Sequence, residues 1–325
     1  MEKDNGTIDK NGDSTRRLTP ELDEWLAWYH EKMEALVAGG FTPTVETTRR
    51  GLADLTRLVT DHPAVAWIED DRLHAPQGDI PVRIYHPDPQ TALPVLIYYH
   101  GGGHMGGSVE VYDPICRKLA LAAHHIVVSV DYRLAPEYPY PAGVEDACSA
   151  VHHIWETLER HPFPYRKELS IAGDSGGGAL CATVAHKVQW QPEITVRRQV
   201  LIYPSLDYTL SLPSVEINGT GYLLEKEKIQ WYFDHYFQSD EDRRKASPLF
   251  MAVSQRLPQT LVVTAEFCPL RDEGAAYVRK LRKEGVDAEQ YHLDTMIHAF
   301  LNMEQVTPEA CRAAYQTIGR FLAYR

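Results

Sequence analysis

The stretch that most constrains this chain is Ser170–Gly178, which reads SIAGDSGGG. A short apolar run, Leu169–Ala172, leads into it, and apolar residues at helical spacing follow from Gly176 to Val188. The pattern predicts a buried strand, a sharp turn and a helix, with Ser175 in the turn. Glycines two positions before and after the serine fit G-x-S-x-G, a turn so tight that side chains at those positions would clash. Such a turn holds the Ser175 hydroxyl out at the carboxyl edge of a sheet.

A phosphate-binding loop is the competing interpretation of this glycine-rich turn. P-loops also connect a strand to a helix, but their motif is G-x-x-x-x-G-K-S/T, in which the lysine reaches the phosphates. The stretch has neither that glycine spacing nor the lysine. We therefore favour a serine nucleophile.

Apolar runs alternate with helical patterns along most of the chain. The predicted buried strands are 95–99, 126–130, 169–172, 200–203, 260–264 and 288–293, and the predicted helices are 113–123, 143–160, 176–188, 273–284 and a last one from Cys311 to Leu322. This alternation predicts a mainly parallel sheet with helices on both faces. Two further strands, 64–75 and 80–85, would form an antiparallel edge around the turn at Gln77 to Asp79.

Two segments depart from this alternation. Thr19 and Pro20 are a helix-start signal, and an amphipathic helix follows until Gly39; it either packs on the domain or forms a lid. The other segment runs from Asp207 to Arg244 and contains aromatic residues at helical spacing, and we assign it to a cap. The expected division is residues 1–45 as tail and cap helix, with 1–18 frayed, 46–206 as the first part of the core, 207–245 as a cap insertion and 246–325 as the second part of the core.

Composition narrows the function classes. The chain has 325 residues, 44% of them hydrophobic, which suits one large α/β domain with an accessory segment. A net charge of -12 argues against nucleic acid and anionic membrane surfaces as partners. The five cysteines have no metal-like spacing and no run of about 20 apolar residues occurs, so we expect no metal, no membrane span and a reducing, cytoplasmic location. The oligomeric state is left open, with a homodimer among the possibilities.

A second glycine-rich motif, His100–Gly103, directly follows the predicted strand 95–99. Attack on an ester carbonyl places negative charge on its oxygen, and fixed backbone N–H groups stabilise that charge; the loss of one donor costs about 3–4 kcal/mol. Gly102 and Gly103, together with Gly176 at the helix start, are the predicted oxyanion hole. A turn that needs glycine only for its dihedral angles is the alternative, and the nearby serine turn argues against it.

The general base is expected to follow the nucleophile, in the order serine, acid, histidine. His298 comes soon after the last predicted strand, where a loop could bring an imidazole over Ser175. His104, near the oxyanion loop, is a minor competitor. Four other histidines fall on predicted helices, where packing or surface roles are expected: His152, His153, His186 and His235.

Five motifs in order carry a family resemblance: His100-Gly-Gly-Gly103, Asp131-Tyr-Arg-Leu-Ala-Pro-Glu137, Gly173-Asp-Ser-Gly-Gly177, Leu201-Ile-Tyr-Pro204 and Pro269-Leu-Arg-Asp-Glu273. From Tyr85 onward the chain resembles the bacterial hormone-sensitive-lipase-like esterases, the acetyl-esterase group of the α/β hydrolases. The resemblance implies a mostly parallel eight-stranded sheet with a helical cap, and hydrolysis of small short-chain esters without a cofactor. It also implies that Ser175 is the nucleophile, His298 the base, and Gly102, Gly103 and Gly176 the oxyanion donors.

One departure from the family pattern concerns the triad acid. The family has an aspartate before Pro-Leu-x-Asp, and this chain has Cys268 there. Loss of the equivalent aspartate in a known triad lowers kcat by about 10⁴. Three alternatives follow: Asp272, one helical turn later, reaches His298; Cys268 accepts the hydrogen bond, best as a thiolate with a lowered pKa; or the third member is absent. Glu266 is an outside candidate.

The sequence therefore leads to ester hydrolysis through an acyl-enzyme on Ser175, with His298 as base. A second hypothesis is a catalytically weak or inactive ligand-binding relative, which only Cys268 favours. A third and weaker hypothesis is amide or peptide hydrolysis by the same residues.

Overall fold

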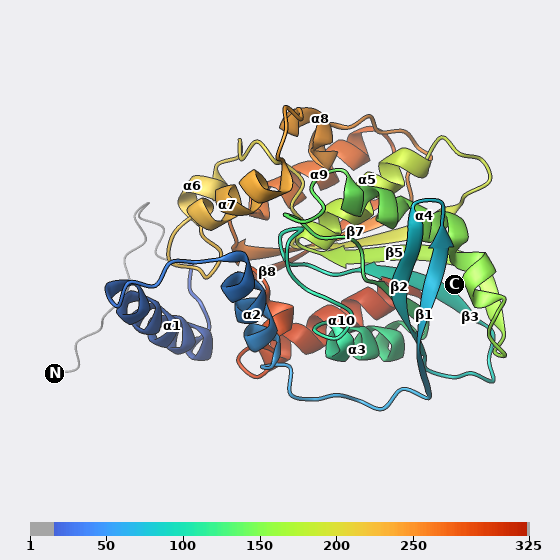
Figure 1. The fold of residues 1–325 in the computed structure, drawn as a ribbon, viewed down its shortest axis with the longest axis horizontal. Coiled ribbons are helices and arrows are strands. Elements are labelled where there is room, and N and C mark those ends of the chain that lie inside the picture. The colour runs from blue at the N-terminus through green and yellow to red at the C-terminus, as the bar shows by residue number, and fades with distance from the viewer. Residues whose placement is uncertain (1–15, 324–325) are drawn as a thin grey trace.

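An eight-stranded, mostly parallel sheet forms the centre of the molecule in the computed structural model, which describes residues 16–323 (Figure 1). The strand order is β1-β2-β4-β3-β5-β6-β7-β8. Only the pairs β1–β2 and β2–β4 are antiparallel. The strands are β1 (Trp67–Ala75), β2 (Gly78–His86), β3 (Leu93–Tyr99), β4 (Ile126–Val130), β5 (Tyr165–Asp174), β6 (Val196–Ile202), β7 (Gln259–Phe267) and β8 (Ala288–Ile297). The predicted parallel sheet and antiparallel edge are confirmed.

Helices cover both faces of the sheet. They are α1 (Pro20–Ala38), α2 (Val45–Thr56), α3 (Asp113–Ala123), α4 (Ala142–Leu158), α5 (Gly176–Val188), α6 (Ser214–Ile217), α7 (Lys226–Tyr236), α8 (Arg243–Ala246), α9 (Arg271–Lys283) and α10 (Pro308–Leu322), with short 3-10 turns at Pro248–Phe250 and Phe300–Met303. In Figure 1, α3 and α10 pack together on one face, and α4, α5 and α9 lie on the other.

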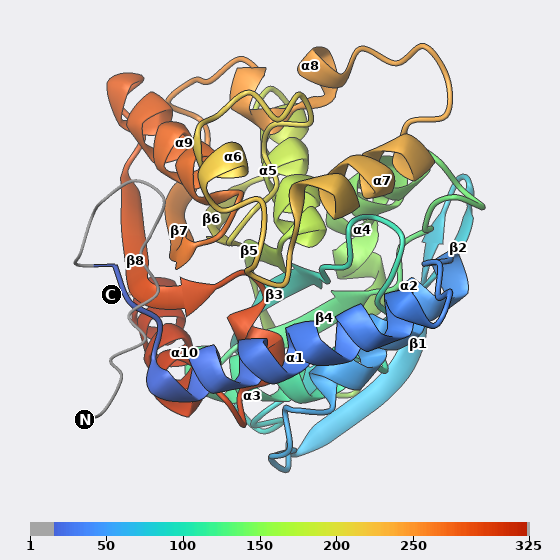
Figure 2. The ribbon, with the colours of Figure 1, turned by 90° about the vertical axis from the view of Figure 1, so that its left-hand side faces the viewer.

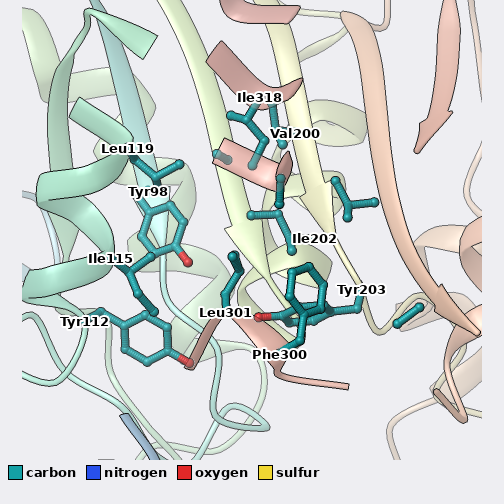
Figure 3. Packing of buried hydrophobic residues seen from close by; sticks show 14 of the residues in the cluster. Tyr98, Tyr112, Ile115, Leu119, Val200, Ile202, Tyr203, Phe300, Leu301 and Ile318 are labelled. Carbon is teal, nitrogen blue, oxygen red and sulfur yellow. The ribbon is translucent and has the colours of Figure 1, made fainter. Parts of the chain in front are cut away.

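The core consists of two layers separated by the sheet. Along β3, Leu96 and Tyr98 belong to the layer under α3 and α10, whereas Val95, Ile97 and Tyr99 belong to the opposite one. Figure 3 shows Tyr98 beside the aliphatic side chains of α3. Because both faces are covered, every residue of β3 is buried, and a large apolar side chain contributes about 1.5–3 kcal/mol on such burial. This explains why central strands appear in the sequence as continuous apolar runs.

Four helices lie beyond the end of the sheet toward which β7 and β8 point: α1, α2, α6 and α7 (Figures 1 and 2). Thr19 caps α1 as expected, since its hydroxyl accepts from the Leu22 N–H. The second helix, α2, was not predicted. It begins with a reciprocal capping box between Thr44 and Thr47. The usual motif has Glu or Gln at the position of Thr47, so this start signal is weak in the sequence.

Some predicted boundaries change. The β1–β2 turn is tighter than expected, because Ala75 pairs directly with Gly78. Most of the tail expected to fray, residues 1–15, lies outside the described residues. At its end the expectation is wrong: Arg16 forms an ion pair of 2.6 Å with Glu266 at the end of β7 and hydrogen-bonds Asn218. Within residues 16–323, no helix is long and apolar enough to cross a membrane.

Candidate active site

Ser175 lies in the sharp turn between β5 and α5, as the motif predicts. Its backbone has φ 53° and ψ -119°, a conformation that non-glycine residues rarely adopt and that costs on the order of 1–3 kcal/mol. The Ser175 N–H donates to the Ile202 carbonyl at 2.9 Å, and its own carbonyl accepts from Ser205 at 3.1 Å. These bonds to β6 and the loop after it hold the strained residue at the carboxyl edge of the sheet.

The flanking glycines are required by close approach. A Cβ on Gly173 would lie 2.3 Å from the Gly177 carbonyl oxygen, and one on Gly177 would lie 2.0 Å from the Tyr99 carbonyl oxygen. Both separations are far below van der Waals contact, so no side chain fits. The structure therefore explains the glycines of the motif by the same close approach that the sequence pattern predicted.

His298 follows β8 directly and faces Ser175. Its Nε2 lies 2.9 Å from Ser175 Oγ, and the imidazole is almost fully buried against the Tyr203 ring, 4.7 Å between ring centres. Burial, and secondarily the positive charge of Lys228, lowers the pKa of His298 to about 3. The imidazole is therefore neutral at pH 7, the form that can accept a proton.

Cys268 occupies the other side of the imidazole. Its Sγ lies 3.2 Å from His298 Nδ1 and also accepts from the Leu270 N–H at 3.3 Å. The thiol is fully buried, and this burial raises its pKa far above the usual range. The expectation of a thiolate with a lowered pKa is therefore wrong, and the group beside His298 is a neutral thiol at pH 7.

The two carboxylates considered as replacements for the triad aspartate point elsewhere. Asp272, in the first turn of α9, accepts from the Ser214 N–H at 3.0 Å and from Arg271 Nε at 2.9 Å, so the expectation that it reaches His298 is wrong. Glu266 is bound by Arg16, by Arg271 at 2.6 Å and by His292 at 3.0 Å. Glu266 and Cys268 are two residues apart, but β7 ends at Phe267, so strand alternation does not place both on the same side.

The glycine loop after β3 lies against the start of α5. A Cβ on Gly176 would be 3.3 Å from the Gly103 nitrogen and 3.1 Å from the His104 nitrogen. Gly102 and Gly103 have φ values of 122° and 63°, which explains the need for glycine there. Among residues 16–323, no hydrogen bond uses the N–H groups of Gly102, Gly103 or Gly176. Their donors are therefore available for a developing oxyanion, and the His104 amide, which the sequence did not single out, lies with them.

Asp174 ties this loop to the strand that carries the serine. Its carboxylate accepts from the Gly101 N–H and the Tyr98 hydroxyl, both at 2.7 Å, and from the Tyr112 hydroxyl at 3.1 Å. Burial raises its pKa to about 6, although these three donors favour the charged form. The sequence motif contains this aspartate, but its role in holding the loop becomes visible only in the structure.

The two histidines of the loop have packing roles. His100 is buried between the Tyr112 and Tyr132 rings, at 5.4 and 4.5 Å between ring centres. His104, the minor competitor for the base, stacks on Tyr236 at 4.0 Å, and its Nε2 lies 3.0 Å from the Tyr208 hydroxyl. Its side chain therefore faces α7 and the chain after β6, and not Ser175.

Sequence reasoning also missed residues of α7 that lie near the site. A Cβ on Gly103 would lie 2.7 Å from Cγ of Tyr232, so this aromatic ring covers the glycine loop. Lys228, one helical turn earlier, is close enough for its charge to lower the pKa of His298. The aromatic pattern of α7 had predicted a cap helix but not which of its side chains reach the glycine loop.

Comparison with known proteins is consistent with this geometry. Residues 96–302 match the family model described as alpha/beta hydrolase fold. The chain is 38% identical to the carboxylic ester hydrolase LipN of Mycobacterium tuberculosis, over 79% of this chain and 70% of that protein. It is 36% identical to an ethyl acetate hydrolase of Pseudomonas putida, over 71% and 74% of the two chains. The solved structure of a hyperthermophilic esterase from the archaeon Pyrobaculum calidifontis has a TM-score of 0.83 and 35% identity, covering 94% of this chain and 98% of that one.

The family model covers more than half of the chain, and the relatives are aligned over most of their own length. The sheet order and the serine turn agree with the fold that the motifs implied. The resemblance to the hormone-sensitive-lipase-like esterases is therefore confirmed, and the chain belongs to the α/β-hydrolase fold family.

Proposed function

We propose that this protein is a serine carboxylesterase that forms an acyl-enzyme on Ser175. The observation that carries the proposal is the 2.9 Å contact between Ser175 Oγ and a buried, neutral His298 Nε2, next to unused backbone N–H groups. The activity is that of the named relatives, a carboxylic ester hydrolase and an ethyl acetate hydrolase.

The reaction proceeds in two steps. His298 takes the Ser175 proton as the oxygen attacks the ester carbonyl, and the N–H groups of Gly102, Gly103 and Gly176 stabilise the oxyanion. The imidazolium then gives its proton to the leaving alcohol. In the second step His298 activates a water molecule, which releases the acid by the same path. No other group is needed to supply or remove a proton.

Cys268 is the proposed third member of the catalytic set. For Nε2 to act as base, Nδ1 must carry the proton and donate it to the sulfur, which already accepts from Leu270. A neutral thiol orients the imidazole but gives less stabilisation to its charged form than a carboxylate would. The proposed role is therefore positioning, with a weaker electrostatic contribution.

We propose that helices at the carboxyl end of the sheet form a cap over the site, made of the N-terminal helix of the segment 1–45 and of the insertion 207–245. The contact of Tyr232 of α7 with Gly103 supports the second segment, and Leu52 of α2 would lie 3.0 Å from a Cβ on Gly102. Since Leu52 lies beyond residue 45, we extend the proposed N-terminal cap to the end of α2. Because these side chains lie so close to the oxyanion loop, we expect the cap to favour short acyl chains and long-chain emulsions to be poor substrates.

The binding-only alternative gains no support from the relatives, which are named as hydrolases. Amide hydrolysis stays a prediction, which a comparison of the rates on ester and anilide substrates tests. The free thiol state of all five cysteines supports a reducing location such as the cytoplasm. Dimerisation also stays a prediction, which the mass of the protein from analytical ultracentrifugation tests.

Labelling and kinetics test the central proposal. A fluorophosphonate probe is expected to add one phosphonyl group to Ser175, located by mass spectrometry, and Ser175→Ala should abolish both labelling and hydrolysis of p-nitrophenyl acetate. Ser149→Ala, in which the changed hydroxyl lies on α4 beside Gln77, serves as control and should behave like wild type. A folded wild-type protein that stays unlabelled, or a Ser175→Ala variant that turns over at the wild-type rate, contradicts the proposal.

A further inference from the structure

One side chain of α7 brings a positive charge to the candidate site without an obvious partner. Lys228 and Tyr232 are four residues apart and therefore lie on the same face of the helix. The Tyr232 ring lies on Gly103 of the glycine loop, and the Lys228 charge acts on His298. The next face of the helix, with Ile229 and Phe233, is buried in the core. Lys228 is thus directed toward the oxyanion loop and the imidazole, while the core face anchors the helix.

The ammonium group of Lys228 has no hydrogen bond or ion pair to a residue in the described part of the chain. Glu225, one turn earlier, is near enough to favour the charged form of Lys228, although no ion pair joins the two side chains in the described structure. The guanidinium groups around the site differ in this respect. Arg49 pairs with Glu137 at 2.6 Å, and Arg271 pairs with Glu266 at 2.6 Å.

Lys228 is partly buried, and the loss of solvent around its ammonium group lowers its pKa, so an unpaired charge there is unfavourable. The adjacent imidazole also lacks a negative partner, because Cys268 is neutral. During catalysis His298 becomes an imidazolium near a second cation, which disfavours the transition state. An anion located between these groups would relieve both unfavourable interactions.

We propose that Lys228 is a specificity-determining residue that binds a carboxylate carried by the ester substrate. The substrate class is an ester with a free carboxylate on its acyl part or on its alcohol part. The bound carboxylate pairs with Lys228 and supplies negative charge near His298, which the protein's own triad lacks. This inference rests on the proposed roles of Ser175 and His298 in ester hydrolysis.

Matched substrate pairs test the proposal. For the alcohol part the pair is para-acetoxybenzoate and its uncharged amide, para-acetoxybenzamide; for the acyl part it is monoethyl adipate and its amide, ethyl adipamate. Within each pair size and shape are similar and only the charge differs. The wild-type protein is expected to favour the charged member of at least one pair in kcat/KM by roughly tenfold or more, the scale of a hydrogen bond to a charged group.

Variants assign this preference to Lys228. Lys228→Met keeps the length of the side chain without its charge and should bring the ratio of charged to uncharged substrate close to one. Lys228→Arg should keep most of the preference. Lys226→Met, two residues away on the same helix, removes an exposed lysine paired with Glu216 and is the matched control; it should keep the wild-type ratio.

The readout is a ratio, so a general loss of activity in a variant cancels. A wild-type ratio at or below one for both pairs, or a preference that survives in Lys228→Met, overturns the inference. Either result can occur while uncharged esters are still hydrolysed in a Ser175-dependent way, which keeps the proposed function intact. Loss of all turnover in wild type would instead contradict the proposed function itself.

Discussion

At the scale of single residues, a thiol beside an imidazole differs from a carboxylate because it can donate as well as accept. If the Cys268 S–H donates to His298 Nδ1, the proton sits on Nε2 and the histidine cannot act as base. The Leu270 N–H, which donates to the same sulfur, does not decide between the two arrangements, because the thiol keeps its own proton and a further lone pair. A carboxylate only accepts, so it fixes the tautomer and also stabilises the imidazolium.

We therefore expect Cys268→Asp to raise kcat for p-nitrophenyl acetate by tenfold or more, within the roughly 10⁴-fold scale of a triad aspartate. Steady-state kinetics at pH 7 to 8 measure the effect. Cys268→Asn is the control, because asparagine has the shape of aspartate without its charge, and it should show no such gain. A folded Cys268→Asp variant that is no faster than wild type would show that the histidine does not need a negative partner here.

The sequence predicted the residues whose positions follow from local motifs and failed where position depends on distant packing. Ser175 and the glycine loop lie as expected, because their turns are set by their own residues. Asp272 was misplaced, because its nearest partners are the backbone of Ser214 and the side chain of Arg271. The contribution of Lys228 was missed, since nothing in the sequence shows which face of α7 meets the glycine loop.

At the scale of elements, some boundaries were predicted to the residue, whereas others, such as the start of β5 at Tyr165, differ by up to four residues. The helix predicted at 113–123 and the strand at 126–130 coincide with α3 and β4. Strands were predicted too short where their ends are polar: β8 runs on through Asp294 and Thr295 as far as Ile297. After Asp294 and Thr295 the strand returns to the core with Met296 and Ile297, and this polar interruption hides its end from a hydrophobicity pattern.

The packing of β5 against α5 gives a paired prediction for two glycines. Gly177→Ala places a methyl group 2.0 Å from the Tyr99 carbonyl oxygen, so it should strongly destabilise the fold. Gly51→Ala, in α2, meets nothing within 4 Å and should stabilise the protein by up to about 1 kcal/mol, because alanine is the better helix former. Urea unfolding of both variants measures the difference. Equal urea midpoints for the two variants would show that the turn between β5 and α5 can move to accommodate the added methyl group.

At the scale of the whole molecule, buried neutral histidines control the response to acid. Burial lowers the pKa of five of them to about 3 or about 4, from an ordinary value of 6.5: His100, His104, His125, His186 and His298. Below pH 6.5 the unfolded chain takes up protons that the folded chain excludes. The stability contributed by these groups is therefore complete above pH 6.5 and is lost as pH falls toward 3.

We expect the urea midpoint to fall steadily between pH 7 and pH 4.5. Each histidine lowers the free energy of unfolding by up to about 1.4 kcal/mol per pH unit. Asp174, Asp131 and Glu273 act in the opposite direction, because burial raises the pKa of each carboxyl group, but the five histidines outnumber them. Circular dichroism at a series of pH values measures the midpoint. His125→Gln should make the decline shallower, and a midpoint that is constant or rises on acidification would contradict the expectation.

The ion pair of Arg16 with Glu266 has a practical consequence for work on shortened versions of this protein. Glu266 lies two residues before Cys268, and Asn218, which also bonds Arg16, donates to the carbonyls of both residues. Trimming the chain to begin at the first helix would remove the Arg16 contacts with Glu266 and Asn218, which stabilise the segment that orients the imidazole. A shortened protein for crystallisation should therefore keep Arg16, even though α1 begins only at Pro20.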